Sequence, residues 1–201
     1  NTAPAILLGV LNILQAESDA VVGVFPADHV IRDTDVFHQR LQAAVRLARK
    51  GHVVTFGITP RYPETGYGYI EGGAERPDGA LVTRRFVEKP DLKTAKHYVD
   101  AGRYFWNSGM FAFRAGVLLE EFQRYQPEML RRMQQLSPDT NAISAADYGR
   151  LPDLSIDYAI MEKTRKGLVL PSDIGWSDIG SWKSLYEFLP KDEHDNVIDG
   201  D

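Results

Sequence analysis

Short apolar runs alternate along the chain with amphipathic patterns of helical period. Val53–Ile58 is a continuous apolar run that ends before Pro60, and the helical pattern before it closes at Gly51. The preceding run, Val21–His29, lacks period-2 alternation, which predicts a central strand of a parallel sheet with both faces covered. Strand, helix and strand in this order predict a βαβ unit with a right-handed crossover.

The most apolar run, Ala5–Leu14, carries hydrophobic residues on nearly every face of a helix. We therefore expect a buried helix, with Thr2 as its cap and Pro4 in its first turn. The run is too short to span a bilayer and lacks the positive flank of a signal peptide, so no membrane partner is expected.

From about Tyr62 the chain becomes rich in Gly, Pro and Tyr, and it then predicts an antiparallel hairpin lobe. Its strands are Tyr67–Glu71 and Ala80–Glu88, joined by the turn Arg76–Gly79. The later elements expected are a helix from Asp91 to Gly102, a strand Met110–Phe113, helices Val117–Tyr125, Glu128–Leu136 and Leu154–Thr164, a strand Gly167–Leu170 and a helix Ser181–Leu189. The prediction is one α/β domain with a mixed, mostly parallel sheet and a hairpin lobe.

Composition narrows the class of protein. The 201 residues, 43% of them hydrophobic, can bury one good core, and the net charge of −5 argues against a nucleic-acid surface. The absence of cysteine excludes disulfides and a cysteine nucleophile, and it makes a reducing cytoplasm the default expectation. Nothing in the pattern decides the oligomeric state, and a homo-oligomer is compatible with it. The opening at Asn1 without Met and the ending at Asp199–Asp201 predict a piece of a longer protein.

Five loops place polar groups or glycines directly after an apolar strand, where open α/β sheets bind their ligands. They are Pro26–His29, Glu64–Tyr69, Glu88–Pro90, Trp106–Gly109 and Gly175–Gly180. In the second loop, Gly66 and Gly68 let backbone N–H groups approach a ligand without a Cβ in the way.

The side chains of these loops predict a site for a sugar phosphate and a metal. Asp28 and Asp178 are candidates for Mg²⁺, which takes one or two carboxylates together with substrate phosphates. Lys89 supplies a compact positive charge for a phosphate. Glu88 and Asn107 can form hydrogen bonds with sugar hydroxyls.

Each residue also has a purely structural interpretation. Asp28 could cap the next turn, Glu88–Lys89 could be a solvated strand end, and the Tyr and Gly residues of the second loop could be ordinary hairpin chemistry. Trp176 and Trp182 are interpreted as core residues or as the wall of a cleft. His29 is interpreted as a packing or hydrogen-bonding residue, because no second His lies at ligand spacing.

The order of five motifs carries more information than any one of them. FPADH, TGYGYI, FVEKP, WNSGMF and GWSDIGSW, at these separations, resemble bacterial mannose-1-phosphate guanylyltransferases over essentially the whole chain. The family includes bifunctional enzymes with a phosphomannose isomerase domain. The resemblance implies a Rossmann-like nucleotidyltransferase fold and transfer of GMP from GTP to mannose 1-phosphate, giving GDP-mannose and pyrophosphate.

The resemblance also implies roles for residues at matching motif positions. By this resemblance, Asp28 and Asp178 hold Mg²⁺, and Lys89 lies near the sugar phosphate. Glu88 is implied to bind mannose hydroxyls, and the mannose pocket is implied to be lined by Tyr67, Gly68 and Asn107. Asn1 and Thr2 are implied to lie near guanine and ribose. The resemblance thus makes Asp28, Lys89 and Asp178 the expected catalytic set.

One departure separates this sequence from the family pattern. The glycine-rich loop GxGTRLWPxSR and the PKQ element, with which the family begins, are absent, so we expect residues 1–201 to be a domain truncated at both ends that turns over negligibly by itself. Two other functions stay open. A metal-dependent glycosyltransferase could use Asp33–Asp35 as its D-x-D pair, although Asp33 also suits a helix N-cap, and a non-catalytic sugar-nucleotide-binding module would lack the loop.

Overall fold

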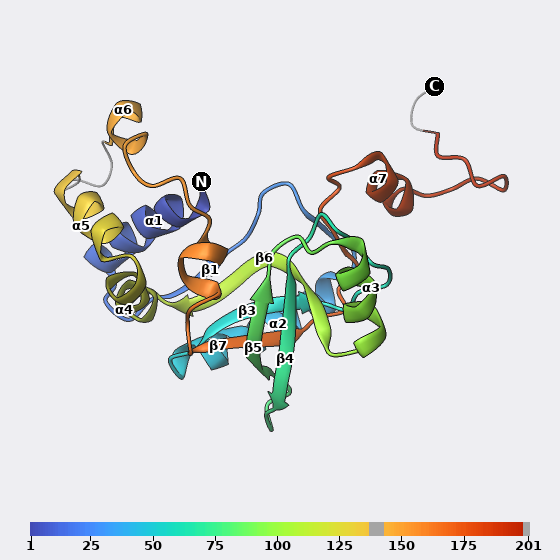
Figure 1. Cartoon of the computed structure of the whole chain (residues 1–201), viewed down its shortest axis with the longest axis horizontal. Coiled ribbons are helices and arrows are strands. Elements are labelled where there is room, and N and C mark those ends of the chain that lie inside the picture. The colour runs from blue at the N-terminus through green and yellow to red at the C-terminus, as the bar shows by residue number, and fades with distance from the viewer. Residues whose placement is uncertain (137–142, 199–201) are drawn as a thin grey trace.

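The computed structural model describes residues 1–136 and 143–198, so the chain end at Asp199–Asp201 lies outside the described residues. Figure 1 shows the elements in space. In chain order they are α1 (Thr2–Ala16), β1 (Val21–Val24), β2 (Val30–Ile31), α2 (Thr34–Arg49), β3 (Val53–Ile58), β4 (Tyr69–Glu75), β5 (Leu81–Val87), α3 (Leu92–Ala101), β6 (Tyr104–Arg114), α4 (Ala115–Tyr125), α5 (Pro127–Leu136), α6 (Ala145–Tyr148), the π-helix η1 (Asp157–Met161), β7 (Gly167–Pro171), β8 (Trp176–Ser177) and α7 (Trp182–Phe188).

The helix ends follow the capping residues of the sequence. The Asp33 carboxylate accepts a hydrogen bond from a backbone N–H in the first turn of α2, and Asp91 does the same for α3. Gly102 ends α3 in the left-handed conformation, at φ 66°. The first helix differs from expectation, because Asn1 rather than Thr2 is its cap: the Asn1 side chain accepts from the backbone N–H of Thr2 at 2.7 Å.

The main sheet has the strand order β1-β6-β3-β7-β5-β4. The long strand β6 lies between β1 and β3 and runs antiparallel to both, and among these strands only β3 and β7 are parallel neighbours. The prediction of a mostly parallel sheet is therefore wrong in its pairing, although the mixed α/β class is confirmed. Val21–Val24 is an edge strand rather than a central one, because β6 pairs with one side of it and no strand of the described residues pairs with the other.

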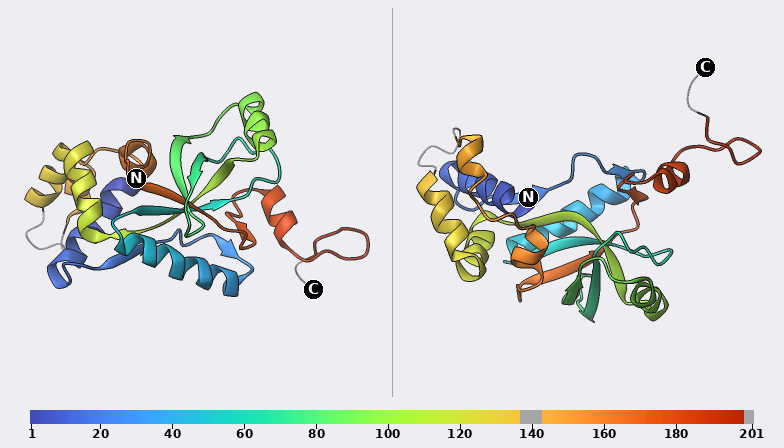
Figure 2. Two further views of the ribbon diagram at one scale, coloured as in Figure 1. Left: turned by 90° about the horizontal axis from the view of Figure 1, so that it is seen from below. Right: turned by 45° about the horizontal axis from the view of Figure 1, so that its top comes forward.

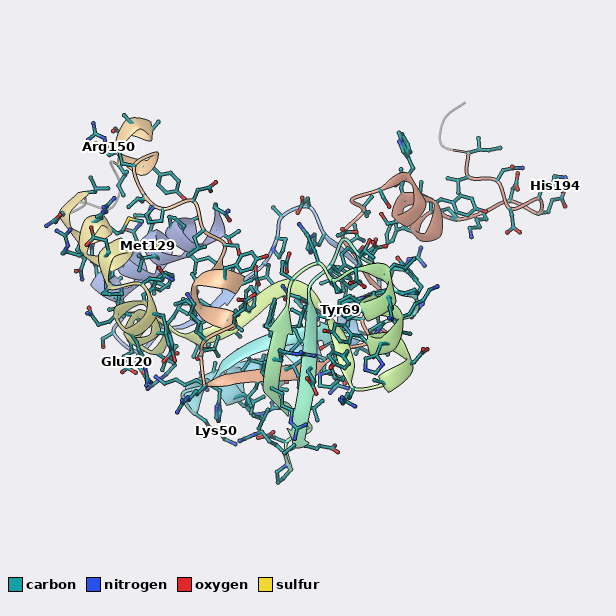
Figure 3. The ribbon with its side chains drawn as sticks, in the orientation of Figure 1. Lys50, Tyr69, Glu120, Met129, Arg150 and His194 are labelled. Carbon is teal, nitrogen blue, oxygen red and sulfur yellow. The ribbon has the colours of Figure 1, made fainter. Side chains whose placement is uncertain are left out.

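The predicted hairpin forms, and it closes the sheet on itself. β4 and β5 pair antiparallel around a turn in which the Gly79 N–H donates to the Arg76 carbonyl at 3.0 Å. β5 also pairs with β7, while the start of β4 pairs with the start of β6. The strands β6, β3, β7, β5 and β4 thus form a closed ring. Tyr69 of β4, labelled in Figure 3, is fully buried on the side of this ring where α3 packs, and its side chain contacts Tyr98 of that helix (Leu92–Ala101).

Two hydrophobic clusters lie on opposite sides of β6 and β3. In one, α1, α4, α5 and η1 pack around Leu7, Phe122 and Ile160. In the other, α2 and α3 pack on the ring around Leu47 and Phe56. Figure 2 shows α2 along one side of the sheet and the cluster of α1, α4 and α5 beyond its end. The first helix is only partly covered, contrary to the expectation of burial on nearly every face, because helices contact it on one side and leave the other side partly exposed.

Two further predictions differ from the structure. Leu154–Thr164 contains only the short π-helix η1 instead of a long α-helix, because its first residues are extended along the start of α1, where the Ala3 N–H donates to the Leu154 carbonyl. Trp182 is 88% exposed at the start of α7, so it forms neither core nor cleft wall. Within the described residues, no helix is long and apolar enough to cross a membrane.

Candidate functional site

An irregularity in β6 presents Asn107 at the surface. The pairing of β6 with β3 shifts register before Gly57, and the Ser108 hydroxyl donates to the Phe56 carbonyl at 2.7 Å. Gly109 has φ 70°, a conformation that glycine adopts at little cost. An irregularity of this kind re-aims neighbouring side chains, and here the Oδ1 of Asn107 accepts a hydrogen bond from the Gly109 N–H at 3.1 Å.

The segment before β4 and the end of β5 meet beside Asn107. The Asn107 N–H donates to the Gly68 carbonyl at 2.8 Å, and a Cβ at Gly68 would lie 2.5 Å from Oε2 of Glu88. Lys89 has φ 45°, which is unusual for a residue with a long side chain. Its Nζ lies 3.8 Å from Oε1 of Glu88, and its side chain is largely exposed. Burial, and then the charge of Asp157, raise the pKa of Glu88.

Tyr67 connects this corner to Asp178. Its hydroxyl donates to Oδ1 of Asp178 at 2.7 Å, and the Gly180 N–H donates to the same oxygen at 3.2 Å. Within the described residues no hydrogen bond ends on Oδ2, so that oxygen remains available to a ligand. The Tyr67 ring makes edge contacts with Trp106 and Trp176, at centroid distances of 5.2 and 5.4 Å. Burial, and then the bond to Asp178, raise the pKa of Tyr67.

A short antiparallel ladder brings the loops of the two predicted metal ligands together. In this ladder Val30 of β2 is paired with Ser177 of β8. Asp28 lies two residues before the first strand, and Asp178 follows the second directly. The two carboxylate residues, far apart in sequence, therefore stand at the same end of one ladder.

His29 has the hydrogen-bonding role predicted for it. The Trp176 indole N–H donates to Nδ1 of His29 at 3.1 Å, and the two rings meet edge to face. Nε2 of His29 lies 3.9 Å from Oδ1 of Asp28, whose side chain is 86% exposed. The ring of Trp176 forms part of a cavity wall, as one of its two predicted roles required.

A shallow cavity of about 210 Å³ collects most of the predicted site residues. Its lining includes Tyr67, Gly68, Glu88, Lys89, Asn107 and Asp178, together with His29, Gly66, Ser108, Gly109 and Trp176. Asp28 lies beside this cavity without lining it. Asn1 and Thr2 are also outside the lining: Asn1 caps α1, and the Thr2 hydroxyl accepts from the Ile156 N–H at 2.9 Å.

Sequence reasoning missed Asp157, which η1 places behind Asn107. Oδ1 of Asp157 accepts a hydrogen bond from Nδ2 of Asn107 at 3.1 Å, and burial raises the pKa of its carboxyl. One signal was available in the sequence. Asp157 follows Ile156 and precedes the apolar run Ala159–Met161, all of which are buried, so an acid stands inside a core-facing stretch.

A comparison of this sequence with models of known protein families shows which family the chain belongs to. A family model described as nucleotidyl transferase matches residues 1–195. The chain belongs to the nucleotidyl transferase family. The α/β fold expected for this family is thereby confirmed, as is the resemblance on which the expectation was based.

Curated relatives of this nucleotidyl transferase chain match it over its whole length. It is 46% identical over 213 residues to the mannose-1-phosphate guanylyltransferase of Escherichia coli K12, covering 100% of this chain and 45% of that protein. It is 44% identical over 209 residues to the alginate biosynthesis protein AlgA of Pseudomonas syringae, covering 100% of this chain and 43% of that protein. The chain therefore spans less than half the length of these relatives.

A solved structure agrees with this family assignment. The crystal structure of a protein from Thermus thermophilus, described as a mannose-1-phosphate geranyltransferase, superposes with a TM-score of 0.86 at 35% identity. The superposition covers 96% of this chain and 56% of that one.

Proposed function

We propose that the protein containing this chain transfers GMP from GTP to mannose 1-phosphate, giving GDP-mannose and pyrophosphate. The family of the chain and the names of its relatives support this reaction class and these substrates. The observation that carries the proposal is the cavity itself. Groups suited to a sugar phosphate gather there with Asp178, from loops spread over much of the chain.

The residues divide by chemistry. Glu88 and Asn107 offer acceptors and a donor to mannose hydroxyls, and Tyr67 and Gly68 line the same pocket. The largely exposed Nζ of Lys89 is free to move to the phosphate of mannose 1-phosphate. Asn1 and Thr2 lie outside this cavity, so we assign them to guanine and ribose on family resemblance alone.

The carboxylates near the cavity suit Mg²⁺. Asp28 is almost fully exposed, and Asp178 keeps Oδ2 available, so both have an oxygen for a metal. Among residues 1–136 and 143–198, no three acidic, His or Cys side chains are grouped to hold a metal by themselves. Mg²⁺ needs no such cage, because it takes waters and substrate phosphates with one or two carboxylates. When bound, it supplies charge neutralisation at the phosphates.

The reaction demands positioning more than acid–base chemistry. A phosphate oxygen of mannose 1-phosphate forms a bond to the α-phosphorus of GTP, the bond from that phosphorus to the β-phosphate oxygen breaks, and pyrophosphate leaves with the electron pair. The attacking oxygen is already ionised at neutral pH, so we assign no general base. His29, whose Nδ1 accepts the indole N–H of Trp176, keeps a structural role.

The D-x-D pattern on which the rival glycosyltransferase hypothesis depends is explained by helix capping. Asp33, the first residue of its D-x-D pair, accepts from the Val36 N–H at 3.0 Å and caps α2.

We propose the cytoplasm as the compartment, because GTP and sugar phosphates are used there. A homo-oligomer stays a prediction, to be tested by light scattering.

The proposal is tested on the complete protein by measuring pyrophosphate release with pairs of nucleotide and sugar phosphate. We expect release with GTP and mannose 1-phosphate in the presence of Mg²⁺, and far less with UTP or with glucose 1-phosphate. Preference for another pair would overturn the substrate assignment. Binding of GDP-mannose without any release would indicate a non-catalytic binding module.

A further inference from the structure

Asp157 stands on an unusual element that is anchored in the core. In η1 the Glu162 N–H donates to the Asp157 carbonyl at 3.0 Å, five residues back, and this defines a π-turn. The last three residues of η1, Ala159–Met161, are buried against α4 and its neighbours, whereas Tyr158 is exposed. Short π-helical turns are rare and are frequently found at functional sites. The buried residues of η1 thus fix the place where Asp157 begins it.

The contacts of Asn107 leave its amide one orientation. Nδ2 donates to Oδ1 of Asp157 at 3.1 Å, while Oδ1 of Asn107 accepts from the Gly109 N–H at 3.1 Å. A flipped amide would set oxygen against carboxylate and N–H against N–H, with both bonds lost. One N–H and one lone pair of Asn107 remain for a ligand. Their directions are therefore set by Asp157 and by the Gly109 backbone.

Asp157 does not line the cavity, so it is not placed to contact a ligand directly. The cavity is lined by Asn107 and by Glu88, whereas Asp157 is behind Asn107 and outside the lining. Its partners in the described residues are the Asn107 amide and groups of its own turn. Through these hydrogen bonds Asp157 reaches a bound sugar only by way of Asn107, while its charge also acts on Glu88 and Lys89.

We propose that Asp157 is a positioning residue that orients the amide of Asn107 toward the sugar of the acceptor substrate. This role rests on the proposed function, because it names the sugar end of that site. Asp157 acts on the recognition of mannose 1-phosphate and leaves the recognition of GTP unchanged.

The test is a mutant cycle on the complete protein, with KM measured separately for mannose 1-phosphate and for GTP. We expect Asp157→Ala to raise the KM for mannose 1-phosphate about tenfold, the loss typical of one hydrogen bond to a charged group, and to leave the KM for GTP within about twofold. Asp157→Asn keeps an oxygen acceptor at the same place, so it should recover most of the loss.

The decisive comparison combines the two partners. If Asp157 acts through Asn107, the double variant Asn107→Ala/Asp157→Ala has the same KM for mannose 1-phosphate as Asn107→Ala alone. Independent, multiplying effects would overturn the proposal, and so would an equal rise in the KM for GTP. Glu162→Gln is the matched control, because it removes a nearby carboxylate that makes no bond to Asn107, and it should behave as wild type.

Two measurements distinguish a failure to fold, a failure of the proposed function and a failure of the positioning role. Calorimetric binding of mannose 1-phosphate needs no turnover, and thermal melting checks that each variant folds. If Asp157→Ala does not fold, Asp157→Ser, which is too short to reach Asn107, replaces it in the cycle. A wild-type protein without activity removes the proposed function and this role together. An active wild type in which Asn107→Ala binds mannose 1-phosphate weakly but Asp157→Ala binds it normally removes this role alone.

Discussion

Replacing Tyr67 by Phe would isolate one hydrogen bond at the predicted metal ligand. The Tyr67 hydroxyl donates to Oδ1 of Asp178 at 2.7 Å, and its ring lies edge-on to Trp106 and Trp176. Tyr67→Phe keeps the ring with its aromatic contacts and removes only the oxygen. The Gly180 N–H then remains as the other donor to Oδ1, and it cannot by itself stop the carboxylate from turning.

The size of the effect follows from the kind of bond. A hydrogen bond to a charged group contributes about 1.5–3 kcal/mol. Because the cavity is open, water can replace part of this bond, which favours the lower end, and about 1.4 kcal/mol corresponds to a factor of ten. We therefore expect the Mg²⁺ concentration for half-maximal activity to rise about tenfold, within the range typical for partners of metal-binding carboxylates.

The assay is a Mg²⁺ titration of pyrophosphate release by the complete protein, accompanied by Mn²⁺ binding measured by electron paramagnetic resonance, which needs no turnover. Tyr69→Phe is the control: its hydroxyl donates to the Glu64 carbonyl at 2.8 Å, so its loss affects stability but touches no site carboxylate. If Tyr67→Phe and Tyr69→Phe have the same metal requirement, the hydrogen bond does not position Asp178, and the reasoning is refuted.

Further predictions concern the other site residues. Lys89→Ala should raise the KM for mannose 1-phosphate about tenfold more than the KM for GTP, and an effect on GTP alone would show that its position is assigned wrongly. Asp28→Ala should abolish Mg²⁺-dependent pyrophosphate release. Asp33→Ala should leave nucleotide binding unchanged and cost about 1 kcal/mol of stability, because it removes a helix cap. The reverse pattern would favour a glycosyltransferase. Burial raises the pKa of Glu88, so the folded protein holds this proton more tightly than the unfolded chain, and stability falls as pH rises from the unfolded pKa to the folded one. Glu88→Gln should therefore raise the melting temperature of the ligand-free protein at pH 7, and a lower one measured by circular dichroism would contradict this.

The sequence predicted which loops carry polar groups to one place better than it predicted the sheet around them. Polar loops that follow apolar strands can be recognised locally, and those around Gly68, Glu88, Asn107 and Asp178 do meet at one cavity. The neighbours of a strand cannot be recognised in this way. Val21–Val24 lies at an edge because β6 is its one partner among the described strands, and no feature of its own residues records that partner.

Asp157 shows a second limit of local patterns. Its stretch has helical spacing, so a regular helix was the natural prediction, but a wider turn forms instead. Its partner Asn107 lies 50 residues earlier, and a single sequence contains no signal for a pairing at that distance. The prediction for Trp182 is wrong for a related reason. The size of this side chain predicts burial, yet the described residues provide no surface against which it packs.

The ladder between β2 and β8 has a consequence for how the protein matures. It joins segments about as far apart as His29 and Trp176, whose hydrogen bond spans 147 residues, and its two residue pairs are extended by backbone bonds from Arg32 to Gly175 and from Asp33 to Ile174. Because closing so long a loop is costly in entropy, we expect these contacts to form late, after the ring and the helices have brought their ends close. Nascent or partly unfolded molecules would hence keep a nearly complete core while lacking the corner that we propose for the divalent ion, so affinity for that ion would be a sensitive gauge of whether folding had reached completion.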